Sequence, residues 1–171
     1  MAYLEDCFDH KKLNSIIRRI SNRLLEDYKK GVFEILAVSG NSGIIIGSII
    51  SYKTKIPLLV IRKPGENSHG ELVEMSYKFR STKKMFSKYA ILDDFISSGA
   101  TIKRMIGTLE SKYKVELSVI YCWNVFAGES FFDVPNRLNI IEYNYTKYVG
   151  VETNKKFVPQ SSGKRICVYN I

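Results

Sequence analysis

The stretch ILDDFISSGAT, residues 91–101, is the clearest indication of the fold class in this sequence. It begins inside a short apolar run, Tyr89 to Leu92, which has the length of a buried β-strand. The pattern from about Thr101 to Tyr113 predicts a helix directly after it. An apolar strand, a short polar loop and a helix together are typical of one unit of a parallel α/β sheet.

The loop between this strand and this helix has the chemistry of an anion site. Glycine lets the backbone approach a ligand closely, and the hydroxyls of Ser97, Ser98 and Thr101 are hydrogen-bond donors. The start of the following helix adds free backbone N–H groups and the positive end of the helix dipole. The same residues also suit an ordinary helix cap, so the loop alone leaves both interpretations open.

Two adjacent acids, Asp93 and Asp94, stand before that loop. Neighbouring carboxylates at a strand end repel each other, and burial adds to the cost. They are tolerated where they accept hydrogen bonds from sugar hydroxyls or help to hold a divalent cation. A phosphorylated ribose carries both hydroxyls and phosphate, so acids and loop together favour such a ligand. The alternative is a solvent-exposed turn with two acids.

The alternation of helices and apolar strands extends in both directions from this stretch. The elements expected upstream are an amphipathic helix over residues 11–29, a strand over 33–38, a buried helix over about 42–53 and a strand over 56–62. Those expected downstream are a half-exposed strand over 72–79, an apolar strand over 115–123 and a closing strand over 166–171. Asp9 suits the N-cap of the first helix and Gly31 suits its end. The pattern predicts a parallel sheet with helices on both faces.

Length and composition agree with a globular protein. The chain has 171 residues, of which 45% are hydrophobic, enough to bury a core. No apolar run approaches the roughly 18 residues needed to span a bilayer, and the opening MAYLEDCFDHKK has acids where a signal peptide carries positive charge. The cysteines, Cys7, Cys122 and Cys167, make neither a disulfide framework nor a zinc pattern. We expect a soluble protein of a reducing cytoplasm.

The net charge of +9 suggests an anionic partner, and nucleic acid is the first general candidate. Residues 51–114, however, hold thirteen basic against six acidic side chains, so this segment carries +7 of the excess. The same segment holds the acidic pair and the anion loop. We therefore expect the positive field to serve a small phosphorylated molecule, although a Lys-rich surface that only confers solubility remains possible.

At residues 91–101 the sequence resembles the phosphoribosyl-pyrophosphate signature of the type I phosphoribosyltransferases, which is an apolar strand, two acids, three residues, Ser or Thr, Gly, one residue, and Thr or Ser. The matching positions are Asp93, Asp94, Ser98, Gly99 and Thr101. Three more segments look like parts of this family: LAVSGNSG (36–43) its pyrophosphate loop, IPLLVIRK (56–63) the strand ending in Arg-Lys of adenine and orotate phosphoribosyltransferases, and PGENSHGELVEMSYKF (64–79) its mobile catalytic loop.

The resemblance implies a role for each matched residue. It implies that Asp93 and Asp94 contact the ribose 2- and 3-hydroxyls. It also implies that they contact, indirectly, the Mg²⁺ that arrives with the substrate. The residues implied to bind the 5-phosphate are Ser97, Ser98, Gly99, Ala100 and Thr101. Those implied to bind pyrophosphate are Ser39, Gly40, Asn41, Ser42 and Gly43, through backbone N–H groups and the cis peptide that relatives use there, together with Arg62 and Lys63. The catalytic set is then Asp93, Asp94, Lys63 and His69.

The resemblance also implies the whole architecture and activity. The expected fold is the α/β, parallel-sheet type I phosphoribosyltransferase fold, with an N-terminal helix and core over residues 1–123 and a small hood with a closing strand over 124–171, in one domain overall. The expected activity is Mg²⁺-dependent transfer of the 5-phosphoribosyl group from phosphoribosyl pyrophosphate to a nitrogenous base, a nucleobase first of all, with release of pyrophosphate. The expected assembly is a homodimer, with Arg62 and Lys63 acting within one chain or across its interface.

Two departures from the family pattern bear on the activity. In orotate phosphoribosyltransferases a further Lys and then His-Gly follow Arg-Lys; here His69 is present, but the stretch PGENS before it is one residue longer and lacks that Lys. His69 is therefore either catalytic or an ordinary loop residue. At the end of the fourth strand no Arg or Lys is in place to meet an orotate or 6-oxopurine base. The aromatic candidates for contact with the base are Phe95, Trp123 and Phe131, and packing is the alternative role for each.

A second class of function stays open. On the same fold, a protein without turnover would sense phosphoribosyl pyrophosphate or a nucleotide, or bind RNA as a regulator. A plain DNA-binding protein is the weaker third reading, because the helix expected over residues 11–29 is nearly charge-balanced and no helix has the concentrated basic face of a recognition helix.

Overall fold

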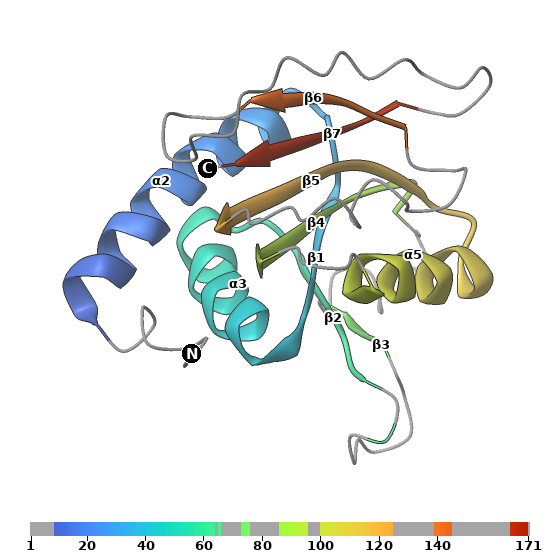
Figure 1. Cartoon of the computed structure of the whole chain (residues 1–171), viewed down its shortest axis with the longest axis horizontal. Coiled ribbons are helices and arrows are strands. Elements are labelled where there is room, and N and C mark those ends of the chain that lie inside the picture. Colours follow the sequence, from blue (N-terminus) through green and yellow to red (C-terminus); the bar gives the residue numbers. More distant parts are fainter. Residues whose placement is uncertain are drawn as a thin grey trace.

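Within the residues that it describes, the computed structural model shows one mixed sheet of seven strands with helices against both faces (Figure 1). The structure describes residues 9–63, 65, 73–75, 86–95, 100–124, 139–144 and 165–170. The helices are α2 (His10–Lys29), α3 (Gly40–Thr54) and α5 (Ala100–Lys112). The strands are β1 (Ile35–Ser39), β2 (Leu58–Ile61), β3 (Val73–Met75), β4 (Lys88–Phe95), β5 (Glu116–Asn124), β6 (Asn139–Asn144) and β7 (Arg165–Asn170).

The strand order is β3-β2-β1-β4-β5-β7-β6, so β1 and β4 lie in the middle of the sheet. All neighbouring strands pair in parallel except β3, which is antiparallel to β2. The predicted parallel sheet with helices on both faces is therefore confirmed. Because β2, β1, β4 and β5 run in one direction, their carboxyl ends meet along one edge, where α/β proteins bind ligands.

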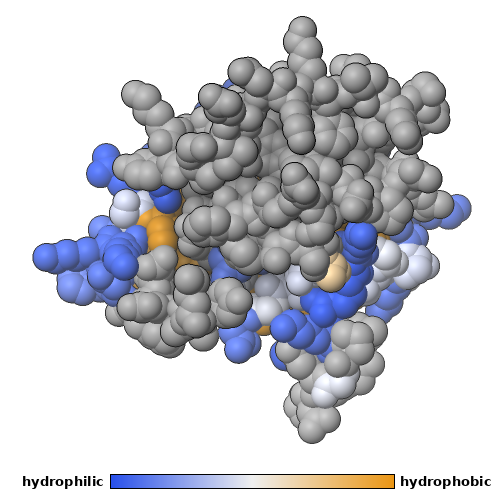
Figure 2. All heavy atoms as spheres, in the orientation of Figure 1, coloured by the Kyte–Doolittle hydropathy of each residue, from blue (hydrophilic) through white to orange (hydrophobic). Residues whose placement is uncertain are grey.

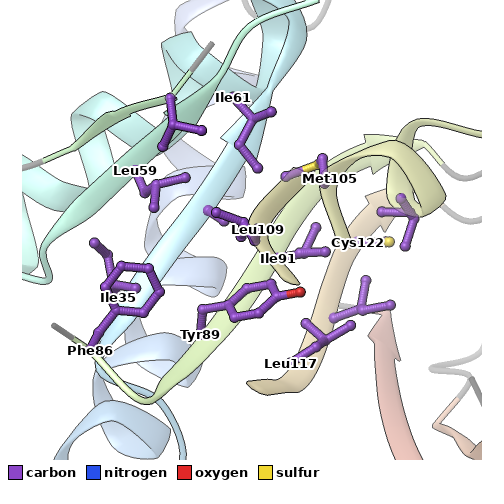
Figure 3. Packing of buried hydrophobic residues seen from close by; sticks show 14 residues of the cluster. Ile35, Leu59, Ile61, Phe86, Tyr89, Ile91, Met105, Leu109, Leu117 and Cys122 are labelled. Atoms are coloured by element: carbon purple, nitrogen blue, oxygen red, sulfur yellow. The ribbon is translucent and has the colours of Figure 1, made fainter. Parts of the chain in front are cut away.

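Alternate residues of the central strands point into two separate apolar layers. One layer lies between the sheet and α5, and Figure 3 shows how Ile35, Ile91 and Met105 pack in it. The other lies between the sheet and the pair α2 and α3, with Leu36 and Leu92 among its buried side chains. The five residues of β1 are all buried, as expected for a strand covered on both faces.

Helix α2 is capped and anchored by polar contacts. The Asp9 carboxylate accepts hydrogen bonds from the backbone N–H groups of Lys11 and Lys12, which confirms the predicted N-cap. At the other end the Tyr121 hydroxyl of β5 donates to the buried Asp27 carboxylate at 2.6 Å, and Arg23 Nε donates to the same oxygen at 2.9 Å. This network fixes the helix against the sheet.

Several predicted boundaries need correction. Helix α3 begins at Gly40, not near residue 42, so the segment taken as a loop is the end of β1 and the first turn of the helix. Strand β4 continues to Phe95 rather than ending at Leu92, because its pairing with β5 continues to Phe95 and Asn124. The acidic pair is therefore part of the strand.

The C-terminal part of the chain extends the sheet. The closing strand expected over residues 166–171 is present as β7, which pairs with β5. Strand β6, which the sequence pattern did not indicate, pairs with β7 at the edge. Both strands fall within the segment predicted as a hood; the division at residue 123 and the hood itself stay predictions.

The described surface is mainly hydrophilic on the face shown in Figure 2, with a small hydrophobic area between charged groups. Most of the helical lysines and arginines are exposed, including Arg18, Arg19 and Lys103. Among the helices that the structure describes, none is long and apolar enough to cross a lipid bilayer.

Close contact between α3 and the sheet depends on Gly47. A Cβ atom at this position would lie 2.7 Å from Val38 Cγ1 of β1 and 3.2 Å from Leu58 Cδ1 of β2. Both neighbours belong to the packed layer beneath the helix, where little space is available for a shift. Gly47 therefore sets how close the helix, and with it the first turn at Gly40, lies to the strand ends.

We expect Gly47→Ala to lower the free energy of unfolding by about 1–3 kcal/mol, because the added methyl overpacks this contact. Gly107→Ala on α5 is the matched control, since a Cβ there meets nothing within 4 Å. The control should raise stability by up to about 1 kcal/mol through helix propensity. Urea unfolding measures both variants, and equal stability changes would contradict the close packing of α3.

Candidate functional site

Two helices begin at the same edge of the sheet, beside its two central strands. Helix α3 starts at Gly40 directly after β1, and α5 starts at Ala100, five residues after the end of β4. The strands are in parallel register with Val38 opposite Leu92, so the next residues along them are Ser39 and Asp93. The backbone N–H groups of the first turn of each helix have no partner within the helix. The edge thus presents two helix N-termini, which favour anions, on either side of an acidic pair.

The segment predicted to bind pyrophosphate, Ser39 to Gly43, turns sharply from strand to helix. Gly40 has a φ of 72°, a left-handed conformation that glycine adopts without strain. The peptide bonds of this segment are trans, so the expected cis peptide is wrong; the positive φ of Gly40 supplies the turn instead. Asn41 is exposed, and Gly43 is buried against Val38 and the Leu92 carbonyl.

The side chain of Ser39 does not cap α3. Its hydroxyl donates to the backbone carbonyl of Ile61 at 2.7 Å and accepts a hydrogen bond from Arg104 Nη2 at 2.7 Å. The first-turn N–H groups of α3 are thereby left for a ligand, as a backbone anion site requires.

The two acids differ in environment. Asp93 is buried, with 6% of its surface exposed, on the α5 side of the sheet, and Asp94 is half-buried. The Asp94 backbone N–H donates to Asp93 Oδ1 at 3.0 Å. Burial, and then the side-chain hydrogen bond and the charge of Asp94, raise the pKa of the Asp93 carboxyl to about 8, while the hydrogen bond from the Asp94 backbone N–H and the charge of Arg104 oppose this shift. The thiol of Cys122, opposite Asp93 on β5, is buried and its pKa is raised for the same reason.

Arg104 is a site residue that sequence reasoning missed. It comes from α5, three residues after Thr101 and therefore one turn further along the same helical face. Its Nη2 donates to the hydroxyl of Ser39, the residue before α3, so Arg104 joins α5 to the start of α3. The spacing from Thr101 was the only signal in the sequence, and it does not say which neighbour the side chain reaches.

Arg62 and Lys63, the basic pair, directly follow β2, which lies beside β1. Arg62 is partly exposed, and its Nε donates to the Glu74 carboxylate of β3. Lys63 is exposed. Because β2 lies beside β1, the pair is on the same edge as the start of α3. Arg62 is thus paired with a residue of β3, which lies within the segment predicted as the mobile loop, residues 64–79.

Other predicted residues lie outside the part of the chain that the structure describes. These are Ser97, Ser98 and Gly99 of the 5-phosphate loop, His69 and Phe131. Ala100 and Thr101 are described and form the first turn of α5. Phe95 and Trp123 are placed in β4 and β5, but their side chains are not described.

Asp93 and Asp94 are adjacent carboxylates at this edge that could help to hold a divalent metal. No group of three or more His, Cys, Asp or Glu side chains with metal-binding geometry occurs among the described residues. Mg²⁺ typically binds one or two protein carboxylates and completes its shell with water and substrate phosphates. Asp93 and Asp94 fit an ion held in that way.

Comparisons with known sequences find similarity to phosphoribosyltransferases. No protein-family model matches the sequence. An adenine phosphoribosyltransferase from Prochlorococcus marinus (strain MIT 9312) is 31% identical over 111 residues, which are 58% of this chain and 65% of that protein. An HGPRTase-like protein from Halorhabdus utahensis is 29% identical over 137 residues, covering 73% of this chain and 70% of that protein. The chain thus spans just under two thirds of the first relative's length.

Comparison with solved structures supports the fold. The adenine phosphoribosyltransferase of Saccharomyces cerevisiae, solved with an imino-altritol bisphosphate and adenine, superposes with a TM-score of 0.55 at 16% identity. The superposition covers 72% of this chain and 73% of the yeast chain. At this identity the likeness concerns the fold alone. The sheet order and this superposition show that the chain has the type I phosphoribosyltransferase fold, and its sequence is similar to those of adenine phosphoribosyltransferases.

Proposed function

We propose that the protein transfers the 5-phosphoribosyl group from phosphoribosyl pyrophosphate to a nucleobase and releases pyrophosphate, with Mg²⁺ bound alongside the substrate. The observation that carries this proposal is the pair of helix N-termini flanking two acids at the ends of adjacent strands. Such an edge suits a ligand with phosphate at both ends and hydroxyls between them. Adenine is the first base to test, because several of the sequence relatives are named for it.

This reaction needs residues that position the substrates and neutralise the charge of the leaving pyrophosphate. Displacement at the anomeric carbon passes through a state with oxocarbenium character, so the enzyme has to orient the base and stabilise the leaving pyrophosphate without a nucleophile of its own. The first turn of α3 would bind the pyrophosphate, and that of α5 the 5-phosphate. When bound, Mg²⁺ would offset the charge of the pyrophosphate.

Asp93 and Asp94 would accept hydrogen bonds from the ribose hydroxyls between these phosphates. Because burial holds a proton on Asp93 near neutral pH in the empty protein, ligand binding would release that proton as the carboxylate gains hydroxyl donors and a cation. Arg62 and Lys63 would face the pyrophosphate, and the excess positive charge of residues 51–114 would draw in the polyanion. Action across a homodimer interface is part of the proposal.

One sequence feature favours a second function. The stretch PGENS lacks the Lys that orotate phosphoribosyltransferases have in this loop, and Arg62 is paired with Glu74. A protein that binds phosphoribosyl pyrophosphate as a sensor would need the same anion site without turnover. Tight binding with no pyrophosphate release on any base would identify it, and salt-sensitive RNA binding would identify an RNA regulator.

We expect pyrophosphate release from phosphoribosyl pyrophosphate and Mg²⁺ in the presence of adenine or another base from a nucleobase panel. The double variant Asp93→Asn with Asp94→Asn should lose at least about a hundredfold in kcat/KM, because two hydrogen bonds to charged groups disappear. The control Glu110→Gln, on the exposed side of α5, should keep its turnover. Full activity in the double variant would contradict the site.

We expect the free energy of unfolding of the ligand-free protein to fall as pH rises from 5 to 8. Native Asp93 keeps its proton up to a pKa of about 8, whereas the unfolded chain loses it near the ordinary value of 3.8, so the unfolded state binds fewer protons in this window. Asp94 and Arg104 are the charged groups that face Asp93, and Cys122 faces it as a buried thiol.

Asp93→Asn, which stays neutral, should flatten this part of the stability curve and raise stability most at pH 8. Glu110→Gln on the exposed side of α5 should leave the fall in place. Urea unfolding at several pH values measures all three proteins. Parallel curves for the wild type and Asp93→Asn would show that Asp93 is ionised in the folded protein throughout this range.

We expect Glu74→Gln to lower the KM for phosphoribosyl pyrophosphate by up to about fivefold, because a partly exposed ion pair of up to about 1 kcal/mol no longer competes for Arg62. Arg62→Gln should raise the KM instead. Steady-state kinetics of both variants test this competition. A higher KM in Glu74→Gln would mean that Glu74 orients Arg62 for the ligand.

A further inference from the structure

Arg104 connects three strand and helix ends at the site through one short chain of hydrogen bonds. Its Nη2 donates to Ser39 Oγ at 2.7 Å, and the same hydroxyl donates to the Ile61 carbonyl at 2.7 Å. Ser39 is the last residue of β1 and directly precedes α3, while Ile61 is the last residue of β2 and directly precedes Arg62. Through Ser39, α5 is thus tied to the start of α3 and to the end of β2.

Arg104 has a charged neighbour but no ion pair among the described residues, since Asp93 is close enough for the two charges to interact. Its Ser39 partner is a neutral hydroxyl, and no carboxylate among the described residues forms an ion pair with it. Its Nε atom is buried and has no hydrogen-bond partner among the described residues. A partly buried cation with an unsatisfied buried donor is costly, and a nearby anion reduces that cost. The first turn of α3, which begins one residue after Ser39, is a place suited to such an anion.

We propose that Arg104 is a positioning residue for the pyrophosphate end of the substrate: it fixes Ser39, and with it the start of α3, and places a positive charge between the two anion-binding helices. This inference rests on the proposed function, because it concerns the same ligand. It adds to Arg62 and Lys63 a third cation, which comes from α5, on the face of the sheet opposite to α3, and acts through Ser39.

A purely structural role is the alternative, in which Arg104 only fastens α5 to the sheet. The two roles differ in what they predict for ligand binding. A fastening residue would lower stability when removed and would leave the affinity of the folded protein for pyrophosphate unchanged. A positioning residue lowers that affinity, and Lys, which keeps the charge and one donor, restores part of it.

The test is isothermal titration of inorganic pyrophosphate with Mg²⁺ into folded wild type, Arg104→Met, Arg104→Gln and Arg104→Lys, with thermal unfolding run on each protein. The matched control is Lys103→Gln, which removes the same charge from the exposed side of α5. We expect Arg104→Met to bind pyrophosphate about ten- to a hundredfold more weakly, the range for loss of a hydrogen bond involving a charged group. Arg104→Lys should recover at least about threefold, and Lys103→Gln should stay within about twofold of wild type, as an exposed, screened charge allows.

A double-mutant cycle tests whether the effect passes through Ser39. If it does, Ser39→Ala and Arg104→Met together should weaken binding little more than Arg104→Met alone. Additive losses would overturn the coupling. Steady-state kinetics add a second readout: the KM for phosphoribosyl pyrophosphate should rise in Arg104→Gln by a larger factor than kcat falls.

The outcomes separate this proposal from the proposed function. Turnover by wild type with unchanged pyrophosphate affinity in Arg104→Met would overturn the role of Arg104 and leave the activity standing. Pyrophosphate binding that depends on Arg104, without turnover on any base, would support the role and refute the transferase activity. Absence of pyrophosphate binding by folded wild type would overturn both.

Discussion

The parallel pairing of β1 with β4 is the constraint on which the site depends. Residues 35–38 and 89–92 are in register and buried on both faces, so neither strand can slip without exposing its side chains. The register brings Ser39 and Asp93 to neighbouring strand ends, from which α3 and, after a short segment, α5 begin. Gly47 lets α3 lie close against β1. A ligand with phosphates at both ends would thus meet a spacing set by the sheet itself.

The charged groups at this edge fit the proposed phosphorylated ligand. Burial and Asp94 raise the pKa of Asp93, while Arg104 donates to a neutral hydroxyl and its Nε has no hydrogen-bond partner among the described residues. Both arrangements cost free energy that a bound, metal-associated polyanion would reduce, whereas the favourable pair of Arg62 with Glu74 would compete with that ligand. The same logic explains why the charge of the middle segment suits a small phosphorylated molecule better than a nucleic acid, for which an extended basic face would be expected.

Much of the fold was predictable because the strands are short apolar runs separated by amphipathic helices. The N-cap at Asp9 and the helix after residue 100 were also readable from local patterns. Strand pairing determines the features that local sequence patterns did not predict. Strand β4 continues through Asp93 and Asp94 because β5 pairs with it, and β6 joins the described sheet through β7. Arg104 was missed for a similar reason, since its partner Ser39 is 65 residues away in the chain. The local sequence predicts which residues lie on a helix, whereas the arrangement of the strands determines which of their side chains come into contact.

The most direct test of the central claim is a crystal structure of the protein with phosphoribosyl pyrophosphate and Mg²⁺, the base being left out. We expect pyrophosphate at the first turn of α3, the 5-phosphate at the first turn of α5, and the ribose hydroxyls on Asp93 and Asp94. The ligand bound elsewhere, or bound at this edge without contact to the two acids, would contradict it.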